Sequence, residues 1–253
     1  MFWYYANRYA IIWGLNTLFF MEPIREGKVK TVYQGVDKDQ VLIHYHDKVT
    51  AGNGEKEDYP EGKGKINNEI SCIIFEKLAE KGIESHFIQF AGPALMRCKK
   101  VEIIPLEVVV RNIAAGSIVR NTTIPEGKKF APEPLIEFFL KDDEKNDPLL
   151  NDARIQAMGM NGLKFMCMSI ARKVNVVLKP LFESIDLELV DYKLEFGLYK
   201  NRVILADEIS PDSCRLWKKG TTESMDKDLF RKDEGDIIQA YSSILESLKN
   251  NVK

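Results

Sequence analysis

Hydrophobic residues alternate with polar ones along several short stretches of this chain, and they recur at helical spacing in three longer stretches. A period of two predicts strands and a period near 3.6 predicts helices, because these are the spacings at which side chains return to one face. Helices are predicted around residues 66–78, ending at Gly82, over 162–182, and around 237–248. Strands are predicted over residues 29–34, 40–46, 85–90, 95–99 and 106–111, with a polar loop over 50–65.

These elements form an early run of strands followed by mixed helices and strands, without sequence repeats. Such an order predicts an α+β fold. We place a boundary near residues 100 to 105, which gives an N-terminal lobe over 22–102 and a C-terminal lobe over 103–253. The chain has 253 residues, of which 45% are hydrophobic, so it can bury a core in one large domain or two small ones.

The strand predicted over residues 190–197 carries an unusual set of side chains. Asp191, Lys193 and Glu195 alternate there with apolar residues, so all three share one face of the strand. Charged residues are rarely buried unless they are paired. The face is therefore either a site for a charged ligand or a solvated surface on which Lys193 neutralises its neighbours.

Another acidic residue, Asp207, lies on the next predicted strand, over residues 204–209. A three-residue loop over 200–202 would place Glu195 directly opposite Asp207, and Glu208 would then point to the opposite face. Two facing carboxylates would suit a hard cation such as Mg2+. A two-residue loop would instead shift the register by one residue and turn Asp207 to the other face. Our prediction is the three-residue loop.

Composition limits the kinds of partner. The net charge is -2 with 29% charged residues, so the chain has no overall attraction to nucleic acid or anionic membranes, and any cationic site must be local. The four cysteines lie far apart without metal-binding spacing, which is typical of a reduced cytoplasmic protein. His44 and His46 share a strand face, and with one other histidine in the chain a surface or packing role is favoured over a transition-metal site.

The first 20 residues differ in composition from the rest. They hold eight aromatic residues and two of the three tryptophans, whereas ordinary globular sequence follows Met21. Arg8 and Asn16 interrupt the apolar run, so it makes a poor secretory signal and a poor membrane span. We interpret residues 1–21 as an atypical aromatic extension ahead of a natural start at Met21. A membrane-surface anchor and an aromatic arm packed on the domain are the alternatives.

Basic residues next to small ones mark two candidate anion sites. Lys28 and Lys30 open the first strand on one face, behind Gly27, where a backbone can approach a phosphate closely. Arg111 follows three valines and precedes a run of small residues that ends at Ser117. Small residues let an anion reach backbone N–H groups and the Ser117 hydroxyl.

Two further polar clusters stand out. The segment 210–215 follows the acidic hairpin and delivers Arg215 beside it. The charged segment 141–148 is by composition a surface loop.

In these motifs the chain resembles the SAICAR synthetase family, the phosphoribosylaminoimidazole-succinocarboxamide synthases of de novo purine synthesis. The resemblance extends from about Ile24 to Leu248, and residues 1–20 have no counterpart in the family pattern. The two signatures are VVVRNIAAGS at 108–117 and LVDYKLEFG at 189–197. Supporting matches lie at 26–33, 64–68, 139–143, 147–148 and 207–217.

The resemblance implies an ATP-dependent ligase that joins L-aspartate to the carboxylate of carboxyaminoimidazole ribonucleotide. The products would be the succinocarboxamide, ADP and phosphate, formed through an acyl phosphate and with Mg2+ as cofactor. The implied fold is a smaller antiparallel-sheet lobe and a larger α+β lobe with ATP in the cleft between them. A cytoplasmic homodimer is implied, and neither a nucleic-acid partner nor stable membrane association is expected.

The same resemblance implies roles for individual residues. Lys193 would lie near the ribonucleotide carboxylate, with Asp191 orienting that lysine. Lys141, Asp147 and Asp212 would lie nearer the aspartate or in a mobile loop. The residues carried over are Lys28, Lys30, Lys99 and Ile103 for ATP; Glu195 and Asp207 for Mg2+; Arg111, Ser117, Arg215, Lys141 and Asp147 for the other substrates; and Lys193, Asp191 and Asp212 for catalysis.

Two other functions fit parts of the sequence. A nucleotide-binding regulator could keep the pockets without turnover, although it would have little need for paired metal carboxylates together with two lysines and two arginines. A membrane-associated scaffold would follow if the aromatic N-terminus were the functional part. Phosphate release that requires both co-substrates tests the regulator, and sedimentation with liposomes tests the scaffold.

Overall fold

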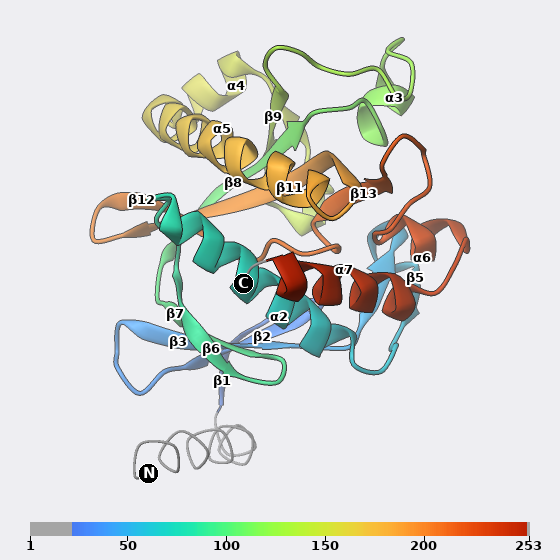
Figure 1. Ribbon diagram of the computed structural model, residues 1–253. Coiled ribbons are helices and arrows are strands. Elements are labelled where there is room, and N and C mark those ends of the chain that lie inside the picture. The colour runs from blue at the N-terminus through green and yellow to red at the C-terminus, as the bar shows by residue number, and fades with distance from the viewer. Residues whose placement is uncertain (1–21, 252–253) are drawn as a thin grey trace.

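The computed structural model describes residues 22–251, which form two main antiparallel sheets with helices packed against them (Figure 1). The first sheet has the strand order β1 (Pro23–Glu26), β2 (Lys30–Gln34), β3 (Gln40–Tyr45), β7 (Leu95–Lys99) and β6 (Phe87–Gly92). The second has the order β10 (Leu149–Leu150), β9 (Leu135–Leu140), β8 (Glu102–Arg111), β11 (Leu187–Tyr199) and β12 (Arg202–Ala206), and β13 (Cys214–Lys218) also pairs with β11.

Three long helices cover these sheets. Helix α2 (Lys63–Glu80) packs on β3, β6 and β7 and lies beside α7 (Ile237–Asn251), as Figure 1 shows. Helix α5 (Asn161–Glu183) packs on β8 and β11 of the second sheet. The short elements are β4 (Val49–Ala51), η1 (Gly52–Gly54), β5 (Lys56–Asp58), α3 (Ser117–Asn121), η2 (Asp143–Lys145), α4 (Asp152–Ala157) and α6 (Asp228–Lys232).

The predicted α+β class and the three long helices are confirmed. Helix α2 ends just before Gly82, which has φ 72° and so occupies a conformation that glycine adopts without steric cost. The predicted polar loop over 50–65 is wrong, because β4 and β5 pair there as a short hairpin and α2 begins at Lys63. Its polar composition reflects the partial or full exposure of most of this hairpin.

The boundary between lobes stays a prediction. Strand β7 ends at Lys99 and β8 begins at Glu102, so the chain changes sheet inside the region chosen for the boundary. One continuous cluster of buried side chains nevertheless runs from Ile43 of the first sheet to Leu194 of the second. Residues 1–21, with the predicted aromatic extension, lie outside the described residues. Between residues 22 and 251, no helix is both long enough and apolar enough to span a lipid bilayer.

One face of β11 belongs to the core and the other is charged, as the alternating pattern predicts. Tyr192, Leu194 and Phe196 are buried, and the Tyr192 hydroxyl donates to the Ala171 carbonyl of α5 at 3.5 Å. The residues between them therefore project from the face of the sheet opposite α5.

The hairpin that joins β11 to β12 differs from the prediction. Tyr199 pairs with Arg202, so the loop has two residues, Lys200 and Asn201, with φ 49° and 63°. Positive φ at both positions is the geometry of the tight hairpin turn that matches strand twist. Glu195 therefore pairs with Ala206, and the predicted three-residue loop with its direct pairing of Glu195 and Asp207 is wrong.

Candidate active site

Two buried carboxylates face each other on the second sheet. Glu195 of β11 pairs with Glu107 of β8, and both side chains are buried. Lys193 Nζ lies 2.6 Å from Glu107 Oε1 and 3.2 Å from Glu195 Oε1. Lys141 Nζ lies 2.6 Å from the same Glu195 oxygen. The two lysines offset the repulsion between adjacent buried anions.

This arrangement fixes the charge of Lys193. Burial alone would lower the pKa of Lys193, but Glu195 and Glu107 outweigh burial and hold that pKa above its ordinary value. Burial raises the pKa of Glu107, and the charge of Lys193 offsets the rise only in part. Lys193 is therefore a cation at neutral pH, placed where an anionic substrate group can contact it.

Asp207 reaches the same face by a turn of the backbone. Strand β12 ends one residue earlier, and Asp207 has φ 61°. Lys30 of β2 forms ion pairs with Asp207 and, at 2.9 Å, with Glu208. Burial would raise the pKa of Asp207, but Lys30 and Lys193 hold it well below its usual value. Asp207 and Glu195 both raise the pKa of Lys193, although the register differs from the prediction. The expectation that Glu208 points away from Asp207 is wrong, since both bind Lys30.

The carboxylates of this face suit a hard cation whose remaining ligands come from the substrate. Glu107, Glu195 and Asp207 offer carboxylate oxygens, and each is paired with a lysine in this structure. Over residues 22–251 no group of three or more His, Cys, Asp or Glu side chains is arranged to hold a metal ion by itself. Mg2+ is commonly bound by one or two carboxylates together with phosphate oxygens and water, and not by protein ligands alone. The carboxylates present therefore fit Mg2+.

A cavity of about 750 Å³ opens beside the charged face. Its wall combines residues from β8, α3 and the loop before it, β11, β13 and the turn before it, and α6. Six of the residues carried over from the family pattern line it, namely Arg111, Ser117, Asp191, Lys193, Asp212 and Arg215.

Arg111 is held rigidly in the wall of this cavity. Its Nε donates to Glu137 Oε2 at 2.6 Å, and its Nη1 donates to Asp191 Oδ2 at 2.8 Å. The third contact, from Nη2 to Ser117 Oγ at 2.8 Å, joins the guanidinium to the hydroxyl predicted to bind the same ligand. A guanidinium fixed on two sides presents a preformed donor to a phosphate.

Arg215 approaches from the neighbouring strand. Its Nη1 lies 2.6 and 2.9 Å from the two Asp191 oxygens, and its Nε lies 2.8 Å from Asp228 Oδ2. A Cβ on Gly116 would lie 2.9 Å from Arg215 Nη2, and Gly116 has φ 67°. Both the close approach and the positive φ therefore require glycine at this position.

Asp191 joins the two arginines. Burial raises the pKa of Asp191, and Arg215 and Arg111 offset part of that rise. We expected Asp191 to orient Lys193, but its carboxylate binds the arginines, while Lys193 pairs with the glutamates. The charged residues of β11 thus lie in two adjacent parts of one site. Asp191 binds the arginines, and Lys193 pairs with Glu195 and Glu107.

Asp212 lies in the wall of the cavity and is tied to two distant helices. Its Oδ2 lies 2.6 Å from Nζ of the fully buried Lys63 on α2. The Tyr241 hydroxyl of α7 donates to Oδ1 at 2.8 Å. Burial would raise the pKa of Asp212, but Lys63 lowers it below its usual value.

The remaining predicted residues lie outside the cavity. Lys28 Nζ lies 2.8 Å from Asp143, and Lys99 Nζ lies 3.0 Å from Glu84. Ile103 lies near the start of β8 and pairs with Gly197 of β11. Asp147 accepts a local backbone hydrogen bond from the loop that contains it.

Our sequence reasoning missed several charged residues of the site, among them Glu107, Lys63 and Asp228. Glu107 could have been found, because it shares a strand face with Arg111 at a spacing of four residues. Lys63 and Asp228 carry no comparable signal, since their partners lie far away in the sequence or in another element.

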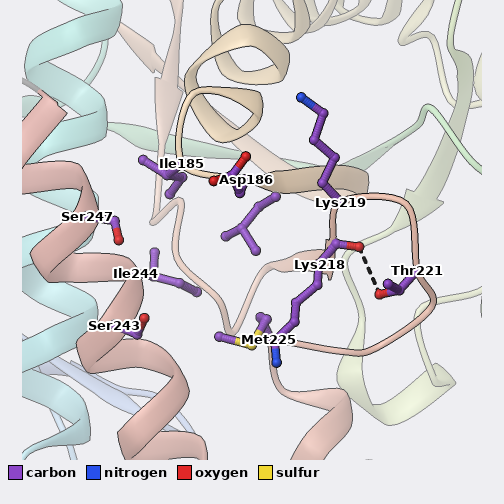
Figure 2. A pocket seen from close by; sticks show the side chains of 10 residues that line it. Ile185, Asp186, Lys218, Lys219, Thr221, Met225, Ser243, Ile244 and Ser247 are labelled. Atoms are coloured by element: carbon purple, nitrogen blue, oxygen red, sulfur yellow. Dashed lines mark hydrogen bonds between the residues drawn. The ribbon is translucent and has the colours of Figure 1, made fainter.

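A second cavity, of about 530 Å³, shares no lining residue with the first (Figure 2). It is lined by α7 residues such as Ile244 and by Met225, Lys218 and Lys219, and the Thr221 hydroxyl donates to the Lys218 carbonyl at 2.9 Å. None of the residues predicted from the sequence lines it. The candidate active site is therefore the first cavity with its adjoining carboxylates.

Comparisons with known proteins agree on one family. A family model described as SAICAR synthetase matches residues 23–248. The phosphoribosylaminoimidazole-succinocarboxamide synthase of Clostridium perfringens (strain SM101 / Type A) is 45% identical over 234 residues, covering 91% of this chain and 98% of that protein. The enzyme of the same name from Methanocaldococcus jannaschii is 46% identical over 241 residues, covering 92% and 97%.

Solved structures give the same result. One described as SAICAR synthetase (Type-2) in complex with ADP superposes with a TM-score of 0.85 at 42% identity, covering 89% of this chain and 97% of that one. The phosphoribosylaminoimidazole-succinocarboxamide synthase from Ehrlichia chaffeensis has a TM-score of 0.86 at 38% identity, covering 90% and 98%.

Proposed function

The chain belongs to the SAICAR synthetase family, and we propose that the charged face of β11 and the cavity beside it form its active site. It is an ATP-dependent ligase of purine biosynthesis, joining L-aspartate to carboxyaminoimidazole ribonucleotide. One observation supports this assignment: Arg111, Ser117 and Arg215 line the same cavity as Lys193. Lys193 in turn pairs with Glu195, so the cavity adjoins the carboxylates.

ATP binds in the cleft between an N-terminal lobe over 22–102 and a C-terminal lobe over 103–253. Lys28 and Lys30 hold its phosphates, and Lys99 and Ile103 lie at the adenine. The ADP complex of a related enzyme at 42% identity supports a nucleotide site. The ion pairs of Lys30 with Asp207 and Glu208 support a phosphate site next to the acids, because phosphate oxygens can exchange with carboxylates as partners of an ammonium group.

Glu195 and Asp207 would hold Mg2+ beside the phosphates of ATP, and Glu107 lies next to Glu195. When bound, Mg2+ supplies positive charge to the transferring phosphoryl group. Lys141, which pairs with Glu195 in this structure, supplies a further cation at the same point. Asp147 stabilises the loop that carries Lys141, through the hydrogen bond that it accepts from the Asp142 N–H.

The ribonucleotide phosphate is held by Arg111, Ser117 and Arg215, since two fixed guanidinium groups and a hydroxyl match its oxygens. Its reacting carboxylate lies against Lys193. The raised pKa of Lys193 keeps the ammonium charged and able to hold that carboxylate for attack.

The reaction proceeds in two steps. A carboxylate oxygen attacks the γ-phosphorus, the bond from phosphorus to the bridging oxygen of ADP breaks, and an acyl phosphate forms. The amino nitrogen of aspartate, after losing one proton to water, then attacks the acyl carbon. The bond between that carbon and the phosphate oxygen breaks, phosphate leaves, and the nitrogen loses a second proton to water. Asp212 lies on the aspartate side of the cavity. Positioning and neutralisation of charge supply most of the catalysis in such phosphoryl transfers.

Isotope transfer tests this sequence. Ribonucleotide labelled with ¹⁸O in its carboxylate should give phosphate that contains one ¹⁸O atom, and ADP should form only when aspartate and the ribonucleotide are both present. Unlabelled phosphate would contradict the acyl phosphate. Glutamate or asparagine accepted as well as aspartate would contradict the substrate assignment.

We propose in addition a cytoplasmic homodimer. The four cysteines are all buried and free, which supports a reducing compartment. Several large hydrophobic side chains on α5, including Phe165, Met166 and Val176, are exposed and support association. Sedimentation equilibrium should give about twice the chain mass of 29.0 kDa, and a mass equal to that of one chain would contradict the dimer.

A further inference from the structure

Lys227 is a cation of the active-site cavity that the proposed reaction has not used. Three other half-buried or buried cations line the cavity, and each pairs with at least two carboxylates: Arg111, Lys193 and Arg215. Lys227 also lines the cavity. Over residues 22–251, however, no carboxylate oxygen lies within 4.0 Å of its Nζ.

The backbone around Lys227 is fixed from both sides. Its own N–H donates to the Pro211 carbonyl at 3.2 Å. The preceding Asp226 is fully buried and accepts backbone hydrogen bonds from Leu216 and Asp228, each at 2.8 Å. These hydrogen bonds hold the backbone of Lys227 in place, so its side chain extends from a fixed position in the wall of the cavity.

The surroundings leave this ammonium group short of negative charge. Burial lowers the pKa of Lys227; Asp212 opposes that shift, and Arg231 and Lys63 add to it. Asp212 is itself already paired with Lys63 at 2.6 Å. A desolvated cation without a direct partner is costly, and an anionic ligand would remove that cost.

The chemistry of the substrates selects the anion. The ribonucleotide phosphate is matched by Arg111, Ser117 and Arg215, and its carboxylate by Lys193. The remaining substrate, aspartate, carries two carboxylates and must lie beside the reacting carboxylate. We propose that Lys227 binds a carboxylate of L-aspartate, an assignment that rests on the proposed function.

The test is steady-state kinetics of the full chain with Lys227→Met, in which each of the three substrates is varied in turn. Loss of one charge-assisted hydrogen bond should raise the aspartate KM roughly 10- to 100-fold. The KM values for ATP and ribonucleotide should change by less than about threefold, and Lys227→Arg should restore part of the aspartate affinity.

Lys219→Met is the control, because it removes the same charge from a residue that lines the second cavity (Figure 2) and not the active-site cavity. It should leave all three KM values unchanged. Lys227→Gln and a thermal melt of each variant separate binding from folding. A soluble Lys227→Gln protein with an unchanged aspartate KM would overturn the proposal.

An increase in ribonucleotide KM that equals or exceeds the increase for aspartate would also overturn it, since Lys227 would then be a ribonucleotide contact. These outcomes differ from failure of the proposed function. In that case the unmodified protein itself would not consume ATP when ribonucleotide and aspartate are both present.

Discussion

Replacing Arg215 by lysine should weaken ribonucleotide binding selectively. The guanidinium makes contacts of 2.6 and 2.9 Å to Asp191 and one of 2.8 Å to Asp228, while remaining available to a ligand in the cavity. An ammonium group acts as a point charge and cannot span both carboxylates. Arg215→Lys therefore loses at least one charge-assisted hydrogen bond within the protein and the forked contact to phosphate.

Each such bond contributes about 1.5 to 3 kcal/mol. The ribonucleotide KM should accordingly rise roughly 10- to 150-fold, because about 1.4 kcal/mol corresponds to a factor of ten. The free energy of unfolding should fall by about 1 to 3 kcal/mol, since one buried carboxylate is left with fewer partners. Coupled measurement of ADP release with each substrate varied gives the KM values, and urea denaturation gives the stability.

The matched control is Arg202→Lys, at an exposed arginine paired with Glu84. It should change neither quantity measurably, because exposed ion pairs contribute little. If Arg215→Lys raised the ATP KM as much as the ribonucleotide KM, the cavity would not be the ribonucleotide site. An unchanged ribonucleotide KM would refute the role of Arg215 altogether.

Three further predictions concern the backbone, pH and the N-terminus. Gly116→Ala should raise the ribonucleotide KM at least tenfold in the same assay, because its Cβ would displace the Arg215 guanidinium; an unaffected KM would contradict this. Burial lowers the pKa of His86 to about 4 from its ordinary 6.5, so as pH falls through this window the unfolded chain binds the proton first and stability falls, by up to about 3 kcal/mol. In urea titrations the free energy of unfolding of His86→Gln should depend less steeply on pH than that of the unmodified protein. An identical slope for the two proteins would contradict the role of His86. Deleting residues 1–20 should leave turnover and solubility nearly intact; a tenfold drop in turnover would show that the aromatic segment packs on the enzyme.

The charged face of β11 could be predicted from sequence because a strand repeats every two residues. Asp191, Lys193 and Glu195 share a face whatever the rest of the fold does. The register of the following hairpin could not be predicted, since it depends on whether Lys200 adopts a positive φ, which lysine seldom does without tertiary support.

The arrangement of the arginines depends on contacts that local sequence does not encode. Asp228 lies on a short helix and meets Arg215 only once β13 and α6 are folded. The pairing of Lys63 with Asp212 joins the first turn of α2 to a loop far along the chain. Strand β9 was missed for another reason: five of its six residues are apolar, and a short apolar run does not distinguish a strand from a buried helix.

A Mg2+ titration of Glu195→Gln and Asp207→Asn tests most directly whether the acids of this face hold the metal of ATP. Each amide keeps the shape of the side chain and removes one charge, so kcat should fall about 10²- to 10³-fold and recover in part at high Mg2+. The double variant should lose less than the sum of the two in free energy, because both side chains act on one ion. Glu188→Gln, on the same strand but paired with Lys129 at 2.7 Å, should behave like the unmodified enzyme. Amide variants at Glu195 and Asp207 with the unmodified Mg2+ dependence and turnover would contradict a metal site at these residues.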